Sequence, residues 1–263
     1  MPRTDRIYKV HMGGHVKEEW RDGHLEILYE NCEEVEAVPY DMMISGADSS
    51  AVSQLRLWKA RDIQNFNMGL FTQGQYTRAL ENSNNAEVIS KVLYPSDNHT
   101  EGKLLRLSQQ YFLVSASIQS IIRDHMAVYG RLDNLPDKVA IHINDTHPAL
   151  CVPELMRLLM DDHGYDWDHA WEITCSTLAY TNHTVMSEAL EKWPQNLIQQ
   201  LLPRIWEIMC EINRRWVDYL AVKFGAGEKL GRNLIIKNGQ VHMANLCLAS
   251  CYMVNGVSRL HGQ

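Results

Sequence analysis

The sequence has no run of basic residues, no stretch of about 20 apolar residues and no apolar signal core at its start. Its 25 basic side chains are outnumbered by 32 acidic ones, which gives a formal net charge of −7. Binding of a nucleic-acid backbone needs a basic surface, and a membrane-spanning helix needs a long apolar segment. The sequence therefore predicts a soluble protein that binds neither nucleic acid nor membranes.

Cysteine and histidine motifs are also missing. The six cysteines form no CxxC pair, and the twelve histidines form neither an HExxH pattern nor another tight cluster. Zinc ribbons and dithiol redox sites use the first pattern, and zinc proteases use the second. We expect no metal ion, and reduced, mostly buried thiols as in a cytoplasmic protein. The cysteines are Cys32, Cys151, Cys175, Cys210, Cys247 and Cys251.

The composition of the 263 residues, 45% hydrophobic and 22% charged, is that of a globular α/β protein with one large domain or two small ones. Polar and apolar residues alternate over the first forty or so positions, which predicts a β meander in residues 1–45. From Ser53 the spacing of apolar residues becomes helical, so residues 46–263 are predicted to be a helix-rich α/β part.

Several long helices are predicted. The one over residues 72–92 has a polar centre, so it should project from the body or pack on a partner of its own. The next, in which Leu107, Tyr111 and Ile118 recur at helical spacing, should lie in the core. Further helices are predicted over 149–160, from Asp168 to Cys175, directly after Thr184, over 194–222 and over 243–255.

Two strand-like runs are each followed by a polar loop. Residues 139–143 precede Asn144-Asp145-Thr146-His147, and residues 178–180 precede Thr181-Asn182-His183-Thr184. Ligands of α/β proteins gather beyond the carboxyl ends of the strands, and these neutral hydrogen-bonding groups suit sugar hydroxyls. The alternative is that they only form turns and helix caps, with Thr146 or His147 capping a helix that has Pro148 in its first turn.

Seven motifs resemble those of α-glucan phosphorylases, in the family's order and over nearly the whole chain. They are Pro-Tyr-Asp (39–41), Leu-Arg-Leu-Trp (55–58), Val-Leu-Tyr-Pro-Ser-Asp-Asn (92–98), Asn-Asp-Thr-His-Pro (144–148), Ala-Tyr-Thr-Asn-His-Thr-Val (179–185), Glu-Ala-Leu-Glu-Lys-Trp-Pro (188–194) and Val-Asn-Gly-Val-Ser-Arg-Leu-His (254–261).

The resemblance implies a partial Rossmann-like N-terminal lobe of a two-lobed, GT-B type glycosyltransferase. The family transfers a glucosyl unit from the non-reducing end of an α-1,4-glucan to inorganic phosphate, giving glucose 1-phosphate. Its pyridoxal phosphate is held by a lysine of the second lobe, and its subunits form homodimers. The polar-centred helix over 72–92 matches the family's dimer-contact helix.

The resemblance also implies roles for single residues. His183 resembles the histidine that hydrogen-bonds the 6-hydroxyl of the transferred glucose, and Asp145 matches an aspartate on the glucan side of the site. These two are the predicted catalytic-site residues. The predicted substrate-binding residues are Asn98, which matches the asparagine that contacts the 2-hydroxyl, Asp97, which resembles a gate carboxylate, His147, Asn182 and Thr184.

The sequence departs from the family in three respects. The chain starts after the family's Gly-Gly-Leu-Gly loop and stops before the second lobe, so we expect no bound cofactor and no activity of this segment alone. Arg123-Asp124 stands where animal enzymes have two arginines for the phosphate of adenosine monophosphate, which predicts no such activation. At the animal glycogen-docking positions, Cys210 and Arg214 are replacements.

Two other functions fit the sequence. The chain could be a non-catalytic glucan-binding or assembly module that keeps Asn98, Asp145 and His183. It could also be a metal-dependent hydrolase that uses Asp145, His147 and His183, for which stoichiometric zinc or manganese would be the mark. Neither explains the order of the seven motifs.

Overall fold

The computed structural model describes residues 2–21, 24–63, 72–75, 81–184, 186–225 and 227–259. The chain folds as two compact units, each made from two stretches of sequence. Unit 1 comprises Met1–Met12 and Cys32–Ser120, and unit 2 comprises Gly13–Asn31 and Ile121–Gln263. Both contain helices and strands, so the predicted mixed α/β class is confirmed. No helix among the described residues is long and apolar enough to cross a membrane.

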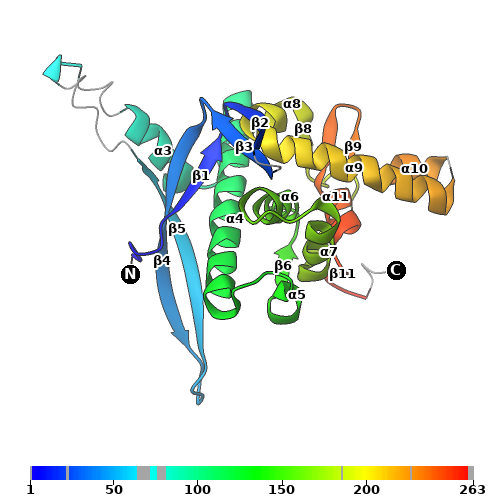
Figure 1. Cartoon of the computed structure of the whole chain (residues 1–263), viewed down its shortest axis with the longest axis horizontal. Coiled ribbons are helices and arrows are strands. Elements are labelled where there is room, and N and C mark those ends of the chain that lie inside the picture. Colours follow the sequence, from blue (N-terminus) through cyan, green and yellow to red (C-terminus); the bar gives the residue numbers. More distant parts are fainter. Residues whose placement is uncertain are drawn as a thin grey trace. The chain divides into compact units, whose positions relative to one another are not determined.

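The described residues of unit 1 form a three-stranded antiparallel sheet and include helices α3 and α4 (Figure 1). The strands lie in the order β1 (Tyr8–Met12), β4 (Glu33–Ser45) and β5 (Val52–Asp62). Helix α3 (Glu81–Lys91) packs on β5, and α4 (Thr100–Tyr129) belongs to this unit up to Ser120. In β1 the alternate residues Tyr8, Val10 and Met12 are buried, as expected for a strand with one covered face. The buried side chains of the unit include Val10, Met12, Val35, Ala37, Ala60, Leu107, Phe112 and Val114.

The start of the chain is not the predicted meander. β1 pairs with β4, whereas β2 (His15–Arg21) and β3 (His24–Glu30) form a separate two-stranded sheet in unit 2. The chain turns away at Gly13 and returns at Asn31, which have φ angles of 70° and 54°. Alternation of polar and apolar residues fixes the two faces of a strand but not its partner, so the sequence pattern could not reveal this pairing.

The predicted change to helical spacing at Ser53 is also wrong. Residues 52–62 form β5, which pairs with β4 over all of its 11 residues. Leu55 and Leu57 alternate with the polar Gln54 and Arg56, and this period of two is typical of a strand. The helix-rich part of the chain therefore begins after Asp62.

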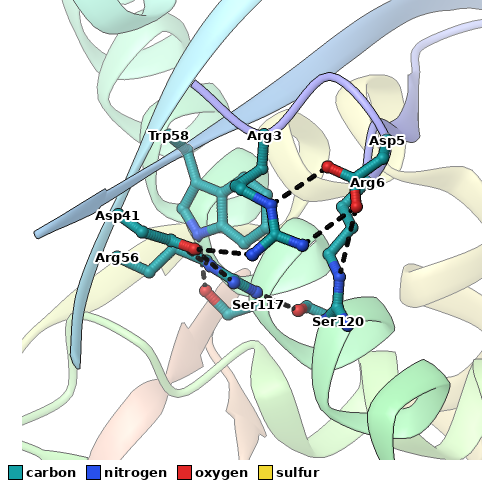
Figure 2. A network of polar contacts seen from close by, with 8 residues as sticks. All are labelled: Arg3, Asp5, Arg6, Asp41, Arg56, Trp58, Ser117 and Ser120. Atoms are coloured by element: carbon teal, nitrogen blue, oxygen red, sulfur yellow. Dashed lines mark hydrogen bonds and ion pairs between the residues drawn. The ribbon is translucent and has the colours of Figure 1, made fainter. Parts of the chain in front are cut away.

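Polar contacts tie the hairpin of β4 and β5 to α4 (Figure 2). Arg56 donates two hydrogen bonds to the carboxylate of Asp41, at 2.6 and 2.8 Å, and a third at 2.6 Å to Ser120 Oγ. Trp58 Nε1 donates to Ser117 Oγ at 3.0 Å. The hydrogen-bonded Arg56 guanidinium holds the pKa of Asp41 below its usual value. The network continues through Arg3, Asp5 and Arg6, which precede β1.

The predicted helix over 72–92 is interrupted. Gln73 and Gly74 form a turn, and Gly74 has a φ of 77°, a left-handed conformation that commonly ends a helix. The described part of α3 begins at Glu81, and residues 76–80 lie outside the described residues. The match of this segment to a dimer-contact helix stays a prediction.

Unit 2 contains a three-stranded parallel sheet in the order β11-β7-β6, formed by β6 (Ile141–Asn144), β7 (Leu178–Asn182) and β11 (Met253–Gly256). The predicted strands at 139–143 and 178–180 are confirmed as β6 and β7. They are joined through α6 (Cys151–Arg157), its π-helical continuation η1 (Leu158–Asp162) and α7 (Trp167–Thr177), because parallel neighbours need a crossover connection.

The remaining elements of unit 2 come before β6 or between β7 and β11 in the sequence. They are α5 (Leu135–Lys138), β8 (Lys192–Pro194), α8 (Gln195–Leu201), α9 (Pro203–Phe224), α10 (Glu228–Asn233), β9 (Ile236–Lys237), β10 (Gln240–His242) and α11 (Met243–Ser250). Strands β8, β10 and β9 form a small antiparallel sheet in that order.

Three predicted helices of this unit need correction. The one over 194–222 is two helices, because Pro203 cannot donate the hydrogen bond that would continue α8 and instead begins α9. The last one stops at Ser250, and Asn255 lies in β11. After Thr184 the described residues form turns rather than a helix, up to β8.

A buried ion pair holds α6. Both oxygens of Glu154, whose side chain has no exposed surface, accept hydrogen bonds from Arg157, at 2.9 and 3.0 Å. Arg157 also reaches Asp162 Oδ1 at 3.2 Å. A bidentate pair of this kind has the geometry that best offsets the loss of hydration.

The six cysteines are unpaired, but fewer are buried than predicted. Cys151 and Cys247 are buried, and the other four are half-buried. Burial raises the pKa of Cys175 and of Cys251 to about 12. These thiols are therefore weak nucleophiles at neutral pH, because the thiolate is the reactive form.

Candidate functional site

The two polar loops predicted from the sequence lie side by side. Their strands, β6 and β7, are parallel neighbours with Asn144 opposite Thr181, so both loops leave the same edge of the sheet. The backbone N–H of Asp145 donates to the carbonyl of Thr181 at 2.9 Å, which joins the loops where they begin. The structure therefore brings together side chains about forty residues apart in the sequence, at the edge where α/β proteins bind ligands.

His183 and Asn144 form the contact between the loops. His183 Nε2 lies 2.6 Å from Asn144 Oδ1, and the imidazole is exposed. An amide oxygen only accepts hydrogen bonds, so Nε2 carries the proton in this pair. In a neutral imidazole Nδ1 is then the acceptor, and it makes no hydrogen bond with the described residues. The ring can thus accept a hydrogen bond from a ligand hydroxyl.

The backbone conformation of Asp145 and one hydrogen bond set the position of its side chain. Its φ is 60°, a left-handed conformation that aspartate adopts more easily than most residues. Its Oδ1 accepts a hydrogen bond from Thr146 N at 2.7 Å. The carboxylate of Asp145, which is half-buried, is therefore held against the backbone of Thr146, the second residue after β6.

The remaining predicted residues of the loops have different surroundings. His147 is exposed and is not the predicted helix cap, because α6 begins later, with Leu150 as its N-cap and no side-chain cap. Asn182 is half-buried and turns the second loop, since its Oδ1 accepts from Thr184 N at 2.9 Å. The side chains of the first loop therefore do not cap α6 as the alternative predicted. Asn182, in contrast, does form a turn, as that alternative predicted.

Glu191, which the sequence patterns did not single out, contacts the first loop. Thr146 Oγ1 donates to Glu191 Oε2 at 2.8 Å, so Thr146 holds this loop to the segment before β8 rather than capping a helix. Nearby Tyr180 is fully buried in β7, and its hydroxyl makes no hydrogen bond with the described residues. Burial, together with thiols and carboxylates around it, including Asp145, raises the pKa of Tyr180.

A line of polar side chains crosses the same sheet. His142 Nε2 contacts Thr181 Oγ1, which donates to Asn255 Oδ1 at 2.9 Å. These three residues come from β6, β7 and β11. Asn255 was predicted to be helical, so its place beside the loops emerged only from the fold.

Asp97 and Asn98 lie in unit 1, whereas His183 and Asp145 lie in unit 2. Asp97 and Asn98 are exposed and lie in the segment that leads into α4. This segment is folded tightly onto the start of the helix, where His99 Nδ1 accepts a hydrogen bond from Gly102 N at 2.9 Å. A Cβ atom on Gly102 would lie 1.8 Å from the carbonyl oxygen of Ser96.

Gly102→Ala should displace the segment that carries Asp97 and Asn98. The new methyl group would overlap a backbone atom, so the segment must move, at a cost of about 1–3 kcal/mol. We expect lower thermal stability and NMR chemical-shift changes over residues 96–99. Gly231→Ala in α10 is the control for inserting a methyl group, because no atom lies near its Cβ position and its backbone is not left-handed. Unchanged shifts at 96–99 would contradict the close contact.

The loops do not fit pyridoxal phosphate or a metal ion. A pyridoxal site needs a lysine amine, yet no hydrogen bond of Asp145, Thr146, Asn182 or His183 involves a lysine or arginine. No group of three or more His, Cys, Asp or Glu side chains among the described residues could hold a metal ion. What these loops offer is hydrogen bonding to an uncharged polar ligand.

The fold and the loops define an α/β protein with polar groups at the carboxyl end of a parallel sheet, and comparison with known proteins shows its family. The family model described as carbohydrate phosphorylase matches residues 1–263. The muscle form of glycogen phosphorylase from Homo sapiens is 44% identical over 278 residues, which cover 99% of this chain and 32% of that protein. The muscle form from Oryctolagus cuniculus is 46% identical over 239 residues, covering 86% of this chain and 28% of that protein.

The chain belongs to the carbohydrate phosphorylase family, which confirms the resemblance drawn from the seven motifs. It spans about a third of the length of the curated relatives it matches, 32% in the case of the brain form from Mus musculus.

Proposed function

We propose that this chain forms the glucose-recognising wall of an α-1,4-glucan phosphorylase. In the complete enzyme, a glucosyl unit would pass from the non-reducing end of the glucan to inorganic phosphate and give glucose 1-phosphate. The chain would belong to the N-terminal lobe of a two-lobed, GT-B type enzyme that is cytoplasmic and homodimeric. The observation that carries the proposal is the contact of His183 with Asn144 beside Asp145, in a chain of this family.

The hydrogen-bonding geometry favours a sugar hydroxyl at His183. Because the Nε2–H group donates its hydrogen bond to Asn144, Nδ1 is left to accept a hydrogen bond from a neutral donor such as the 6-hydroxyl of glucose. An uncharged hydroxyl also avoids the cost of burying a charge beside an imidazole. Asp145, His147, Asn182 and Thr184 would line the same side of the glucan. For Asp97 and Asn98 in unit 1, a contact with the substrate rests on the family resemblance alone.

Phosphate and cofactor would be held by other groups. The loop side chains are neutral or anionic apart from the imidazoles, and a carboxylate such as Asp145 repels a phosphate dianion. Pyridoxal phosphate would supply a proton to the substrate phosphate in the complete enzyme. The contribution of these loops would be to bind and orient the glucosyl unit, which lowers the barrier by fixing the geometry of the reactants.

The test is whether His183 forms a hydrogen bond with the 6-hydroxyl of the sugar. We expect 6-deoxyglucose to bind this protein about fivefold more weakly than glucose, the value of one hydrogen bond of about 1 kcal/mol. In His183→Ala the two sugars should bind equally. Saturation-transfer NMR and calorimetry would measure both affinities.

His163→Ala serves as the matched control, because His163 is also exposed but follows η1, away from both loops in the chain. It should keep the fivefold preference. If His183→Ala also kept the preference, the assignment of His183 to the 6-hydroxyl would be wrong.

A further inference from the structure

The segment that carries Asp97 and Asn98 is held to the start of α4 by a histidine. The backbone N–H of Gly102 donates a hydrogen bond to His99 Nδ1 at 2.9 Å, and His99 directly precedes the helix. The carbonyl of Ser96 lies against Gly102, where a Cβ atom would meet its oxygen at 1.8 Å. The imidazole therefore helps to position a segment that includes two of the predicted substrate-binding residues.

Histidine is an unusual residue to bind the first turn of a helix. The first four N–H groups of a helix have no partner within it, and the side chains of Ser, Thr, Asp and Asn usually accept from them. A hydroxyl or amide oxygen accepts whatever the pH, whereas an imidazole nitrogen accepts only while it carries no proton. In the contact with Gly102, Nδ1 of His99 is therefore unprotonated, and Nε2 carries the proton of a neutral ring.

Protonation of His99 would remove this contact. An imidazolium has an N–H group at both nitrogens, so it has no lone pair to offer to Gly102. Its positive charge would also face the positive end of the helix dipole, which is unfavourable. Histidine side chains ordinarily change their charge between pH 5 and 8. We therefore expect the contact on the alkaline side of this range and its loss on the acid side.

Glu101 offers the protonated ring another partner. Its Oε2 lies 3.7 Å from His99 Nδ1, and the two side chains are 86% and 61% exposed. An ion pair between such exposed side chains is weak, so it would not hold the segment in place of the lost contact. Asp97, Lys103 and Arg106 are the other charged residues of the segment and of the first two turns of α4, and none of them forms an ion pair with His99 in the described part of the chain.

Contacts that do not titrate hold the chain before the segment. Gln109 Nε2, from α4, donates to the carbonyl of Val92 at 2.7 Å. The guanidinium of Arg106 lies 5.5 Å from the centroid of the Tyr94 ring. None of these groups changes its charge between pH 5 and 8. Loss of the histidine contact should therefore affect residues 96–99 and leave the neighbouring chain in place.

We propose that His99 is a pH-dependent positioning residue, which holds Asp97 and Asn98 at the start of α4 when it is neutral and releases them when it is protonated. The change is reversible, because only a proton is gained or lost. The contact of Asp97 and Asn98 with a substrate rests on the proposed function, whereas the contact of His99 with Gly102 does not. Acidification would thus loosen a substrate-binding segment without unfolding the protein.

NMR spectroscopy of the protein without sugar tests the proposal. The ring ¹⁵N signals of His99 should show an unprotonated Nδ1 at pH 8. As the ring is protonated toward pH 5, the exchange protection of the Gly102 amide, corrected for intrinsic rates, should fall about fivefold, the value of one helix-capping contact. His99→Ala should show the low protection at both pH values. His99→Asn should keep the high protection at both, because an amide oxygen is a good cap that does not titrate.

His163→Asn is the matched control, because His163 is also exposed but lies in unit 2, outside this segment. It should retain the fivefold change of the natural protein, and circular dichroism at both pH values would establish that each variant is folded. Constant protection of Gly102 from pH 8 to pH 5, or a fivefold fall that persists in His99→Asn, would overturn the proposal. Neither result involves a sugar, so the role proposed for His183 would be unaffected.

Discussion

Arg157→Met should lower the free energy of unfolding by about 3–5 kcal/mol, because it removes the two hydrogen bonds and the positive charge that Arg157 provides to the buried carboxylate of Glu154. Glu154 has no exposed surface, so water cannot replace the two hydrogen bonds that Arg157 donates. Methionine fills most of the space left by the arginine stem. Urea unfolding followed by circular dichroism would give the difference.

Two further variants identify the cause. In Glu154→Leu with Arg157→Met no fully buried charge is left behind, because Asp162, another partner of Arg157, has a half-exposed side chain, and most of the lost stability should return. Arg214→Met breaks a bidentate pair with Glu211 on the exposed side of α9, and should change stability by only about 0–1 kcal/mol. Equal effects of Arg157→Met and Arg214→Met would show that burial does not govern these pairs.

The second large effect is expected at Asp41 in the network of Figure 2. Asp41→Asn removes the charge opposite Arg56 while keeping the size of the side chain. The side chain of Asp41 is only 6% exposed, so we expect a loss of about 2–3 kcal/mol near neutral pH. Thermal unfolding in low-salt buffer would measure it.

The pH dependence of this variant has a definite sign. Arg56 lowers the pKa of folded Asp41 below its ordinary value of 3.8. The stabilisation is therefore complete above that value and is lost as the pH falls through the lower, folded pKa. The difference between the natural protein and Asp41→Asn should shrink on acidification from pH 5 downward. A difference that stays constant across this range would show that the charge of Asp41 is not what stabilises the hairpin.

Local patterns in the sequence predicted the strands better than their partners. The alternation that marks β1, β4 and β7 is visible in a few residues, and the crossover between β6 and β7 follows from the helix between them. The pairing of β1 with β4 is not visible, because the intervening hairpin alternates in the same way. β11 is short and follows a helix without a turn signal, so its residues were assigned to that helix.

The residues of the candidate site also differ in whether the sequence could predict them. The two polar loops could be singled out because each follows a predicted strand, and the resemblance to α-glucan phosphorylases then selected His183 and Asp145 within them. Glu191 could not, because it lies on a different segment and contacts the first loop through Thr146. Asn255 was missed together with β11.

The split of unit 1 around Gly13–Asn31 sets the order in which its parts can form on the ribosome. β1 is made before β2, β3 and β4, but the strand that it pairs with is not complete until Ser45 has emerged. In the interval β2 and β3 can already close their local hairpin, whereas β1 has no neighbour of its own. β1 is thus among the last of these strands to acquire a neighbour, and in the meantime its unpaired backbone is open to a chaperone.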